Sequence, residues 1–184
     1  MPNRFVFLDR DGTLVEDHGF VHRLSDYALL PGTIEALQLL RRAGFRLAIV
    51  TNQSGIGRGI FGTDDFWAFQ RRLLEDLAAA DVHIEETYVC PHRPEDGCDC
   101  RKPRPGLVWQ ARDRFSIDLR ESWVIGDHAS DVALGVAAGC RSVLVLTGHG
   151  AEERARVIAA PGPPALIVAD VLDAARHIVG GQAD

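Results

Sequence analysis

Short apolar runs alternate along this chain with longer stretches in which apolar residues recur every three or four positions. Short runs rich in Val, Ile and Leu are typical of buried strands, and they predict strands at Phe5 to Leu8, Leu47 to Thr51, Thr87 to Cys90, Trp123 to Ile125, Ser142 to Leu146 and Leu166 to Val168. The longer stretches predict helices at Thr33 to Ala43, Thr63 to about Ala80, Leu107 to Phe115, Ser130 to Ala138 and Asp170 to Val179. From Ala151 to Pro164 we expect a short helix and then a loop, because the prolines at the end of this segment stop a helix. Strands that alternate with helices indicate an α/β fold, with a doubly wound, mainly parallel sheet covered by helices on both faces.

The composition and charge of the chain restrict its function. Of 184 residues, 46% are hydrophobic and 25% are charged, which predicts one compact domain over residues 1–184. Acidic residues outnumber basic ones by 26 to 20, for a formal charge of -6, and no run of Lys and Arg is present. Nucleic acids and anionic membranes attract basic surfaces, so we expect neither as a partner. No apolar stretch reaches the roughly twenty residues that span a bilayer or resembles a signal-peptide core, so we expect a cytoplasmic protein. We also expect a monomer.

Two carboxylates, Asp9 and Asp11, directly follow the first predicted strand. The active crevice of an open parallel sheet lies at the carboxyl ends of its strands. Two carboxylates at positions i and i+2 point to the same side there, which suits Mg²⁺ binding and a nucleophile paired with an acid or base. A lone Asp-x-Asp is more often an ordinary acidic turn, so the functional interpretation depends on the other strand ends.

Polar residues also mark later parts of the predicted sheet. The second strand leads into the segment 51–59, whose hydroxyl, amide and backbone N–H groups can bind an anion, with Arg58 nearby to supply charge. Lys102 follows a cysteine-rich segment. Asp127 comes at the end of the fourth strand and favours metal binding, while Asp131 either supports it or is simply an acidic residue in the first turn of the next helix. Taken singly, each of these features is more often structural than functional.

The segment 90–100, called the zinc loop below, contains three cysteines and one histidine: Cys90, His92, Cys98 and Cys100. Three thiolates and one imidazole form a complete tetrahedral shell for Zn²⁺, which is typical of a structural zinc site. A disulfide is the weaker alternative, because Cys98 and Cys100 are too close in sequence to pair easily and a third cysteine would be left over. Bound zinc would order this loop and fix the adjacent Arg101 and Lys102.

Taken together and in this order, four motifs resemble those of the haloacid dehalogenase (HAD) superfamily of phosphohydrolases. The motifs are Asp-x-Asp-Gly-Thr from Asp9, the strand-terminal Thr51, Lys102, and Gly-Asp-x-x-x-Asp from Gly126. The resemblance implies that Asp9 is the nucleophile that forms an aspartyl-phosphate, and that Asp11 is the general acid for the leaving group and later the base for water. It also implies that Thr51 and Lys102 hold the phosphoryl oxygens.

The same resemblance implies a catalytic Mg²⁺ on the carboxylates of Asp9 and Asp127 and the backbone carbonyl of Asp11, with Asp131 in support. HAD phosphatases often carry a cap domain, inserted after the first motif or between the second and third. Here residues 11–31 span only about twenty positions, and the stretch 54–102 is filled by one helix, one strand and the zinc loop. We therefore expect no cap domain, with the zinc loop and residues 17–22 forming the rim of the site.

One branch of the superfamily, the D-glycero-D-manno-heptose 1,7-bisphosphate 7-phosphatases, resembles this chain in more detail. The similar stretches are 7–13, 17–21, 51–56, 90–92 and 98–103, within a region of similarity from about residue 5 to residue 147. The resemblance implies a small phosphorylated sugar as the substrate and a role in making activated heptose for surface polysaccharide or glycoprotein. It also implies substrate contacts from Asp17, His18, Gly19, Phe20, Asn52, Gln53, Ser54 and Arg101.

The position after Asp127 departs from this branch, which usually has Lys there, whereas this chain has His128. Histidine is a shorter donor than lysine and is fully charged only when protonated. Our hypothesis is that His128 faces the substrate site. Arg58 is an alternative source of the missing charge, and a solvent-facing His128 is the simpler alternative. The histidines at other helix ends and on the predicted surface are interpreted as structural: His83, His149 and His177.

Three other functions are compatible with parts of the sequence. Histidinol-phosphate phosphatases resemble this chain in the capless fold, the short zinc loop and the Arg-Lys-Pro segment, and they differ mainly at the rim. A polynucleotide phosphatase fits the chemistry, but the acidic chain has no basic track for a strand. A non-catalytic zinc-dependent interaction domain is a third alternative, but it would not need both Asp9 and Asp11.

Overall fold

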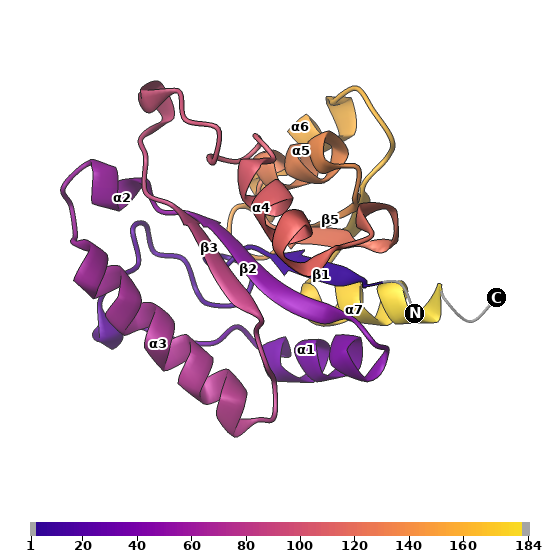
Figure 1. Cartoon of the computed structure of the whole chain (residues 1–184), viewed down its shortest axis with the longest axis horizontal. Helices are drawn as coiled ribbons and strands as arrows, with labels where there is room; N and C mark the ends of the chain where they lie inside the picture. The colour runs from indigo at the N-terminus through magenta and orange to yellow at the C-terminus, as the bar shows by residue number, and fades with distance from the viewer. Residues whose placement is uncertain (1–2, 182–184) are drawn as a thin grey trace.

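A computed structural model describes residues 3–181 as a six-stranded sheet with helices on both faces (Figure 1). The strands are β1 (Phe5–Leu8), β2 (Arg46–Asn52), β3 (Glu86–Cys90), β4 (Trp123–Gly126), β5 (Arg141–Val145) and β6 (Leu166–Val168). Their order in the sheet is β3-β2-β1-β4-β5-β6, and every neighbouring pair is parallel. The predicted fold class is confirmed, and each strand begins and ends within one residue of its predicted position.

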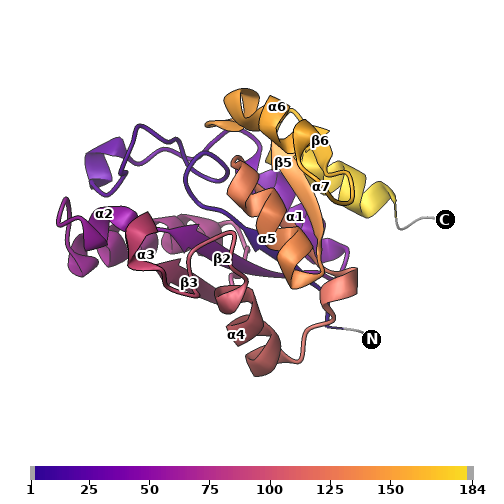
Figure 2. The same ribbon diagram turned by 90° about the horizontal axis from the view of Figure 1, so that it is seen from above.

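Helices α1, α3 and α7 lie on one side of the sheet and α4, α5 and α6 on the other (Figures 1 and 2). The helices are α1 (Thr33–Arg42), α2 (Ser54–Gly57), α3 (Thr63–Ala79), α4 (Gly106–Phe115), α5 (Ala129–Ala138), α6 (Gly150–Ala159) and α7 (Val171–Gly180). Short 3-10 turns are η1 (Leu24–Asp26), η2 (Pro94–Asp96) and η3 (Leu119–Glu121). The single turn α2 was not predicted, because four residues are too few to show helical periodicity.

The central strand β1 is fully buried and divides its side chains between two cores. Val6 and Leu8 belong to the cluster shared with α1, α3 and α7, whereas Phe5 and Phe7 pack with α4 and α5. Both faces of a parallel sheet are covered by helices, so its strands are mainly apolar, and β1 is apolar at every position. Burying a side chain of this size contributes about 1.5–3 kcal/mol to stability. Buried strands are therefore built from apolar residues, and these short apolar runs made the strands recognisable in the sequence.

The order in which strands are added to the sheet reverses at β1: β2 and β3 lie on one side of it, and β4, β5 and β6 lie on the other. Leu8 is paired with Ile49 of β2 and with Ile125 of β4, and the backbone N–H of Asp9 donates to the carbonyl of Ile125 at 2.9 Å. The carboxyl ends of three motif-bearing strands therefore meet where ligands bind in open α/β sheets.

The segments between the motifs are short. Only η1 lies between β1 and α1, and the chain from β2 to the zinc loop contains α2, α3 and β3. Residues 3–181 thus contain no inserted cap domain, as expected. Within the same residues, no helix combines the length and apolar character needed to cross a membrane.

Candidate active site

Lys102 reaches the end of the central strand from the segment after the zinc loop. Its Nζ lies 2.7 Å from Asp9 Oδ1 and 2.6 Å from Asp131 Oδ1, and it donates to the carbonyl of Val50 at 2.9 Å. The side chain is buried. Burial opposes the ammonium charge, but the carboxylates of Asp131 and Asp9 outweigh it and raise the pKa of Lys102. Lys102 is therefore a fixed positive charge beside Asp9.

Three carboxylates form a cluster at this point, since Asp9, Asp127 and Asp131 each offer an oxygen within 4.8 Å of the others. Burial, followed by the charge of Asp9, raises the pKa of Asp127 to about 8. Burial also raises the pKa of Asp9, although Lys102 opposes this. Fully ionised, the three carboxylates would carry three negative charges against the single positive charge of Lys102. Hard carboxylate oxygens with uncompensated charge fit a Mg²⁺ ion, which would supply the missing positive charge.

Two glycines make room for the carboxylate of Asp127. A Cβ atom at Gly12 would lie 2.1 Å from Asp127 Oδ2, and one at Gly148 would lie 2.2 Å from the same atom. Both glycines have positive φ, of 76° and 53°, a region that other residues rarely adopt. The backbone N–H of His149 donates to Asp127 Oδ2 at 2.8 Å. The turns after β1 and β5 thus enclose one metal-directed carboxylate.

Asp11 is held by three donors. Arg10 donates from Nε to Oδ1 at 2.7 Å and from Nη2 to Oδ2 at 2.9 Å, and Gln53 Nε2 donates to Oδ2 at 2.7 Å. Burial raises the pKa of Asp11, while the guanidinium of Arg10 opposes the rise. A carboxyl group whose pKa is raised stays protonated closer to neutral pH, as a general acid must.

The side chains of Asn52 and Gln53 bond to other site residues. Gln53 Nε2 donates to Thr51 Oγ1 at 2.9 Å as well as to Asp11. Asn52 Oδ1 accepts the backbone N–H of Lys102 at 3.0 Å, and its Nδ2 donates to the carbonyl of Lys102 at 3.3 Å. Both residues, which the sequence predicts as substrate contacts, also line the cavity that opens above the site, so their contact with substrate stays a prediction while their amides bond to Thr51, Asp11 and Lys102.

A polar cavity of about 370 Å³ opens above these groups. Its lining residues are Asp9, Asp11, Asp17, Phe20, Thr51, Asn52, Gln53, Ser54, Arg101, Lys102, Asp127, His128, Ser130 and His149. Two of the predicted substrate contacts, His18 and Gly19, do not line it, and His18 Nε2 lies 3.0 Å from Glu16 Oε2 at the surface. Their contact with substrate stays a prediction, although their neighbours Asp17 and Phe20 line the cavity.

His128 lines the cavity, and its Nδ1 lies 3.4 Å from Glu153 Oε2. Arg58, the alternative source of charge, is exposed after α2 and does not line the cavity. His149, interpreted from the sequence as structural, does line it, and its Nε2 lies 3.5 Å from Asp17 Oδ2. A signal for His149 was present in the sequence, because it follows the fifth strand, whose carboxyl end also faces the crevice.

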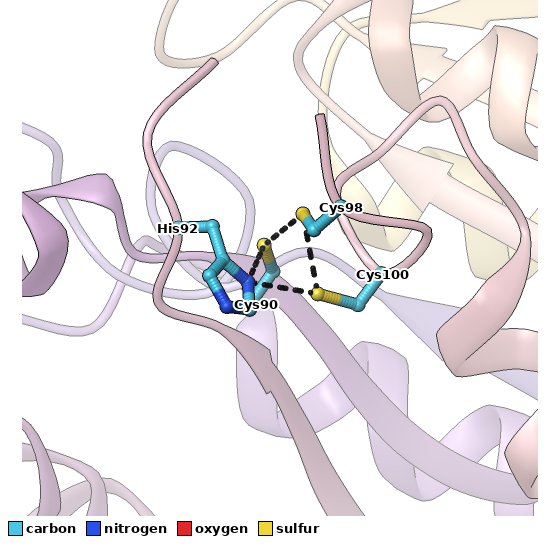
Figure 3. Close-up of side chains that lie close together, drawn as sticks. All are labelled: Cys90, His92, Cys98 and Cys100. Atoms are coloured by element: carbon cyan, nitrogen blue, oxygen red, sulfur yellow. Dashed lines mark hydrogen bonds between the residues drawn. The ribbon is translucent and has the colours of Figure 1, made fainter. Parts of the chain in front are cut away.

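The side chains of the zinc loop converge on one point (Figure 3). Cys98 Sγ lies 3.6 Å from Cys90 Sγ and 3.4 Å from Cys100 Sγ. His92 Nδ1 lies 3.2 Å from Cys100 Sγ and 3.7 Å from Cys90 Sγ. In a tetrahedral zinc site with ordinary Zn–S and Zn–N bonds, neighbouring ligand atoms are about 3.6–3.8 Å apart, so these four residues fit Zn²⁺. All four cysteines of the chain are free, so no disulfide bond forms in the zinc loop.

Backbone hydrogen bonds connect the zinc loop to the cavity. The carbonyl of Cys90 accepts the N–H of Gln53 at 2.7 Å, and the carbonyl of Pro91 accepts the N–H of Gly57 at 2.9 Å. Arg101 Nη1 donates to the carbonyl of His92 at 3.3 Å. Order in the zinc loop therefore extends to the segment after β2 and to Arg101 at the cavity.

The fold and the carboxylate site define a HAD-like hydrolase, and comparisons with known proteins agree. The family model of HAD-hydrolase-like proteins matches residues 99–174. The D-glycero-β-D-manno-heptose-1,7-bisphosphate 7-phosphatases of Escherichia coli K12 and Pasteurella multocida are 42% and 43% identical to this chain over 151 and 155 residues. These alignments cover 78% and 80% of this chain, and 79% and 84% of the two relatives.

A solved structure gives the same result. The D,D-heptose 1,7-bisphosphate phosphatase of B. bronchiseptica, in complex with magnesium and phosphate, matches with a TM-score of 0.89 and 32% sequence identity. The match covers 97% of this chain and 99% of that one. Because identity at this level extends over most of each chain, this chain belongs to the heptose-1,7-bisphosphate 7-phosphatase family of HAD-like phosphatases.

Proposed function

We propose that this protein removes the 7-phosphate of D-glycero-D-manno-heptose 1,7-bisphosphate in the biosynthesis of activated heptose. The observation that carries the proposal is the position of Lys102 Nζ, 2.7 Å from Asp9 and 2.6 Å from Asp131, beside the buried Asp127. Phosphoryl transfer needs a positioned nucleophile and positive charge around a group that stays negative. The names of the relatives support the choice of substrate.

In the first step, a carboxylate oxygen of Asp9 attacks the phosphorus, the bond from phosphorus to the sugar oxygen breaks, and an aspartyl-phosphate forms. Asp11 gives its proton to the departing sugar oxygen. Thr51 and Lys102 hold the phosphoryl oxygens. In the second step, the Asp11 carboxylate takes a proton from the water that attacks the phosphorus, and inorganic phosphate leaves Asp9.

Two metal ions belong to this proposal. The carboxylates of Asp9 and Asp127 and the backbone carbonyl of Asp11 hold Mg²⁺, with Asp131 in support. When bound, Mg²⁺ offsets the charge of the phosphoryl group and of the nucleophile. The zinc loop holds a structural Zn²⁺ that fixes Arg101 through the carbonyl of His92.

The rim of the cavity binds the rest of the substrate. Asp17, Ser54, Arg101 and His128 offer polar groups to a sugar and to its second phosphate, and Phe20 adds an aromatic side chain to the lining. A cavity with this lining selects a small polyhydroxylated phosphate ester rather than a nucleic acid strand. The proposal includes a single-domain monomer that acts in the cytoplasm.

A phosphate-release assay with a panel of substrates tests the function. The panel contains α- and β-heptose 1,7-bisphosphate, fructose 1,6-bisphosphate and histidinol phosphate, each with Mg²⁺. We expect the highest kcat/KM for one heptose anomer, and no turnover by Asp9→Asn, which retains the shape of the site but lacks the nucleophilic carboxylate. A clear preference for histidinol phosphate would replace the heptose assignment by the histidinol-phosphate alternative.

A further inference from the structure

Arg10 lies between the two motif carboxylates and is completely buried, with a relative exposure of 0%. Its guanidinium carbon lies 5.2 Å from the ring centre of Phe66 and 4.6 Å from that of Phe69, both on α3. Removing a guanidinium from water is costly unless it is paired and hydrogen-bonded. A side chain buried at this cost must gain specific contacts, and its partners indicate what those contacts do.

The partners of Arg10 belong to the catalytic acid and to the rim. Its Nε and Nη2 donate to the two oxygens of Asp11 at 2.7 and 2.9 Å, and Nη2 also donates to the carbonyl of Val21 at 2.9 Å. Two parallel N–H donors fix the plane of a carboxylate as well as its position. The aromatic rings of Phe66 and Phe69 hold the guanidinium in turn. One buried side chain thus connects Asp11 to the rim segment 17–22.

We propose that Arg10 is a positioning residue that aims Asp11 at the leaving oxygen and stabilises the carboxylate formed when Asp11 gives up its proton. This inference rests on the proposed role of Asp11 as the general acid. As the bond from Asp9 to phosphorus forms and the bond from phosphorus to the sugar oxygen breaks, the proton of Asp11 passes to that oxygen. Asp11 becomes negative at that moment, and two N–H groups of Arg10 are already directed at it.

The leaving group separates this role from a merely structural one. A sugar alkoxide is a poor leaving group and needs the proton of Asp11, whereas p-nitrophenolate is a stable anion that departs without one. Loss of Arg10 is therefore expected to slow the phosphorylation of Asp9 by a sugar phosphate and to leave its phosphorylation by p-nitrophenyl phosphate largely intact. General damage to the site would slow both reactions.

The experiment measures aspartyl-phosphate formation by rapid quench, and the p-nitrophenol burst by stopped flow, in full-length enzyme with Mg²⁺. Arg10→Met keeps the length and the ring contacts but removes the donors. We expect it to slow phosphorylation by heptose bisphosphate at least about 100-fold, the usual contribution of a general acid, and to change the burst rate less than about 5-fold. Arg10→Lys, which retains charge but not the paired donors, should be intermediate.

A second variant and a double variant keep the result interpretable. Phe69→Leu removes one ring from the guanidinium of Arg10 without altering a polar group. We expect the rate of Asp9 phosphorylation to fall severalfold with the sugar phosphate and to change little with p-nitrophenyl phosphate. If Arg10→Met does not fold, Phe69→Leu provides the test. Asp11→Asn should reproduce the selectivity of Arg10→Met, and combining the two changes should cause no further loss. Equal losses with both substrates, or additive losses in the double variant, would overturn the proposal.

Failure of the substrate assignment gives a different result. If the wild-type enzyme does not hydrolyse heptose bisphosphate but hydrolyses another alkyl phosphate, the proposed function is wrong while the Arg10 comparison can be made with that ester. If heptose bisphosphate is hydrolysed and Arg10→Met treats both leaving groups alike, the function stands and the role of Arg10 is refuted.

Discussion

Replacing Asp127 by Asn is expected to stabilise the Mg²⁺-free protein while abolishing its phosphatase activity. Asp127 is buried, with 2% of its surface exposed, and lies within 4.8 Å of the carboxylates of Asp9 and Asp131. It accepts one backbone hydrogen bond, from His149 at 2.8 Å. Asparagine has the same shape and a carbonyl oxygen that can accept this bond. The main change is therefore the loss of one buried carboxyl group that can ionise.

The sign and size of the effect follow from the pKa of Asp127, which burial and the charge of Asp9 raise from 3.8 to about 8. A carboxyl group with a raised pKa binds its proton more tightly in the folded state, so its contribution to stability is lost as pH rises from about 4 to about 8. At pH 7 this amounts to on the order of 4 kcal/mol. The amide of the Asp127→Asn variant does not titrate, and bound Mg²⁺ would offset the charge in the wild type.

The assay is thermal unfolding at pH 5 to 8.5 in Mg²⁺-free buffer and with excess Mg²⁺, with zinc left in place. In Mg²⁺-free buffer we expect the free energy of unfolding of Asp127→Asn to exceed that of the wild type by at least about 1 kcal/mol at pH 8, and by less at pH 5. For a domain of this size each kcal/mol raises Tm by about 2–4 °C. Added Mg²⁺ should raise the Tm of the wild type more than that of the variant. Asp113→Asn, at an exposed position of α4, makes the same charge change away from the site and should have little effect. A variant that is less stable than the wild type at pH 8 without Mg²⁺ would refute the reasoning.

Three further changes test other parts of the site. Gly12→Ala places a Cβ 2.1 Å from Asp127 Oδ2 at a backbone φ of 76°, so we expect weaker Mg²⁺ binding by calorimetry and loss of activity; unchanged affinity would contradict the close packing. Removing zinc with a zinc-selective chelator, or replacing Cys98 by Ser, should increase amide hydrogen exchange in residues 90–101 and around Gln53, and added zinc should restore protection only in the wild type. Because His149 lines the cavity beside Asp17, His149→Ala should raise KM severalfold with little change in kcat, whereas Arg58→Ala, outside the cavity, should change neither; equal effects of the two would argue against a substrate contact.

The sequence by itself determined the sheet and the positions of the motifs. Both faces of the sheet are covered, so the strands are mainly apolar, and β1 from Phe5 to Leu8, which is apolar at every position, could be located to the residue. Asp9 and Asp127 could be assigned to one crevice because parallel strands present their carboxyl ends at the same edge. The spacing of Cys90, His92, Cys98 and Cys100 was informative because a tetrahedral zinc shell needs this donor set.

The tertiary structure alone decided where the polar side chains point. Asn52 and Gln53 are next to Thr51 in sequence, but their amides bond to Lys102 and Asp11, which are distant along the chain. The paths of the loops turn His18 toward the surface and bring His149 to the cavity. The burial of Arg10 against two rings of α3 could not be predicted either, because Arg10 lies in a motif of polar residues. Strand patterns depend on local periodicity, whereas these orientations depend on which distant donors and acceptors the folded chain places within hydrogen-bond reach.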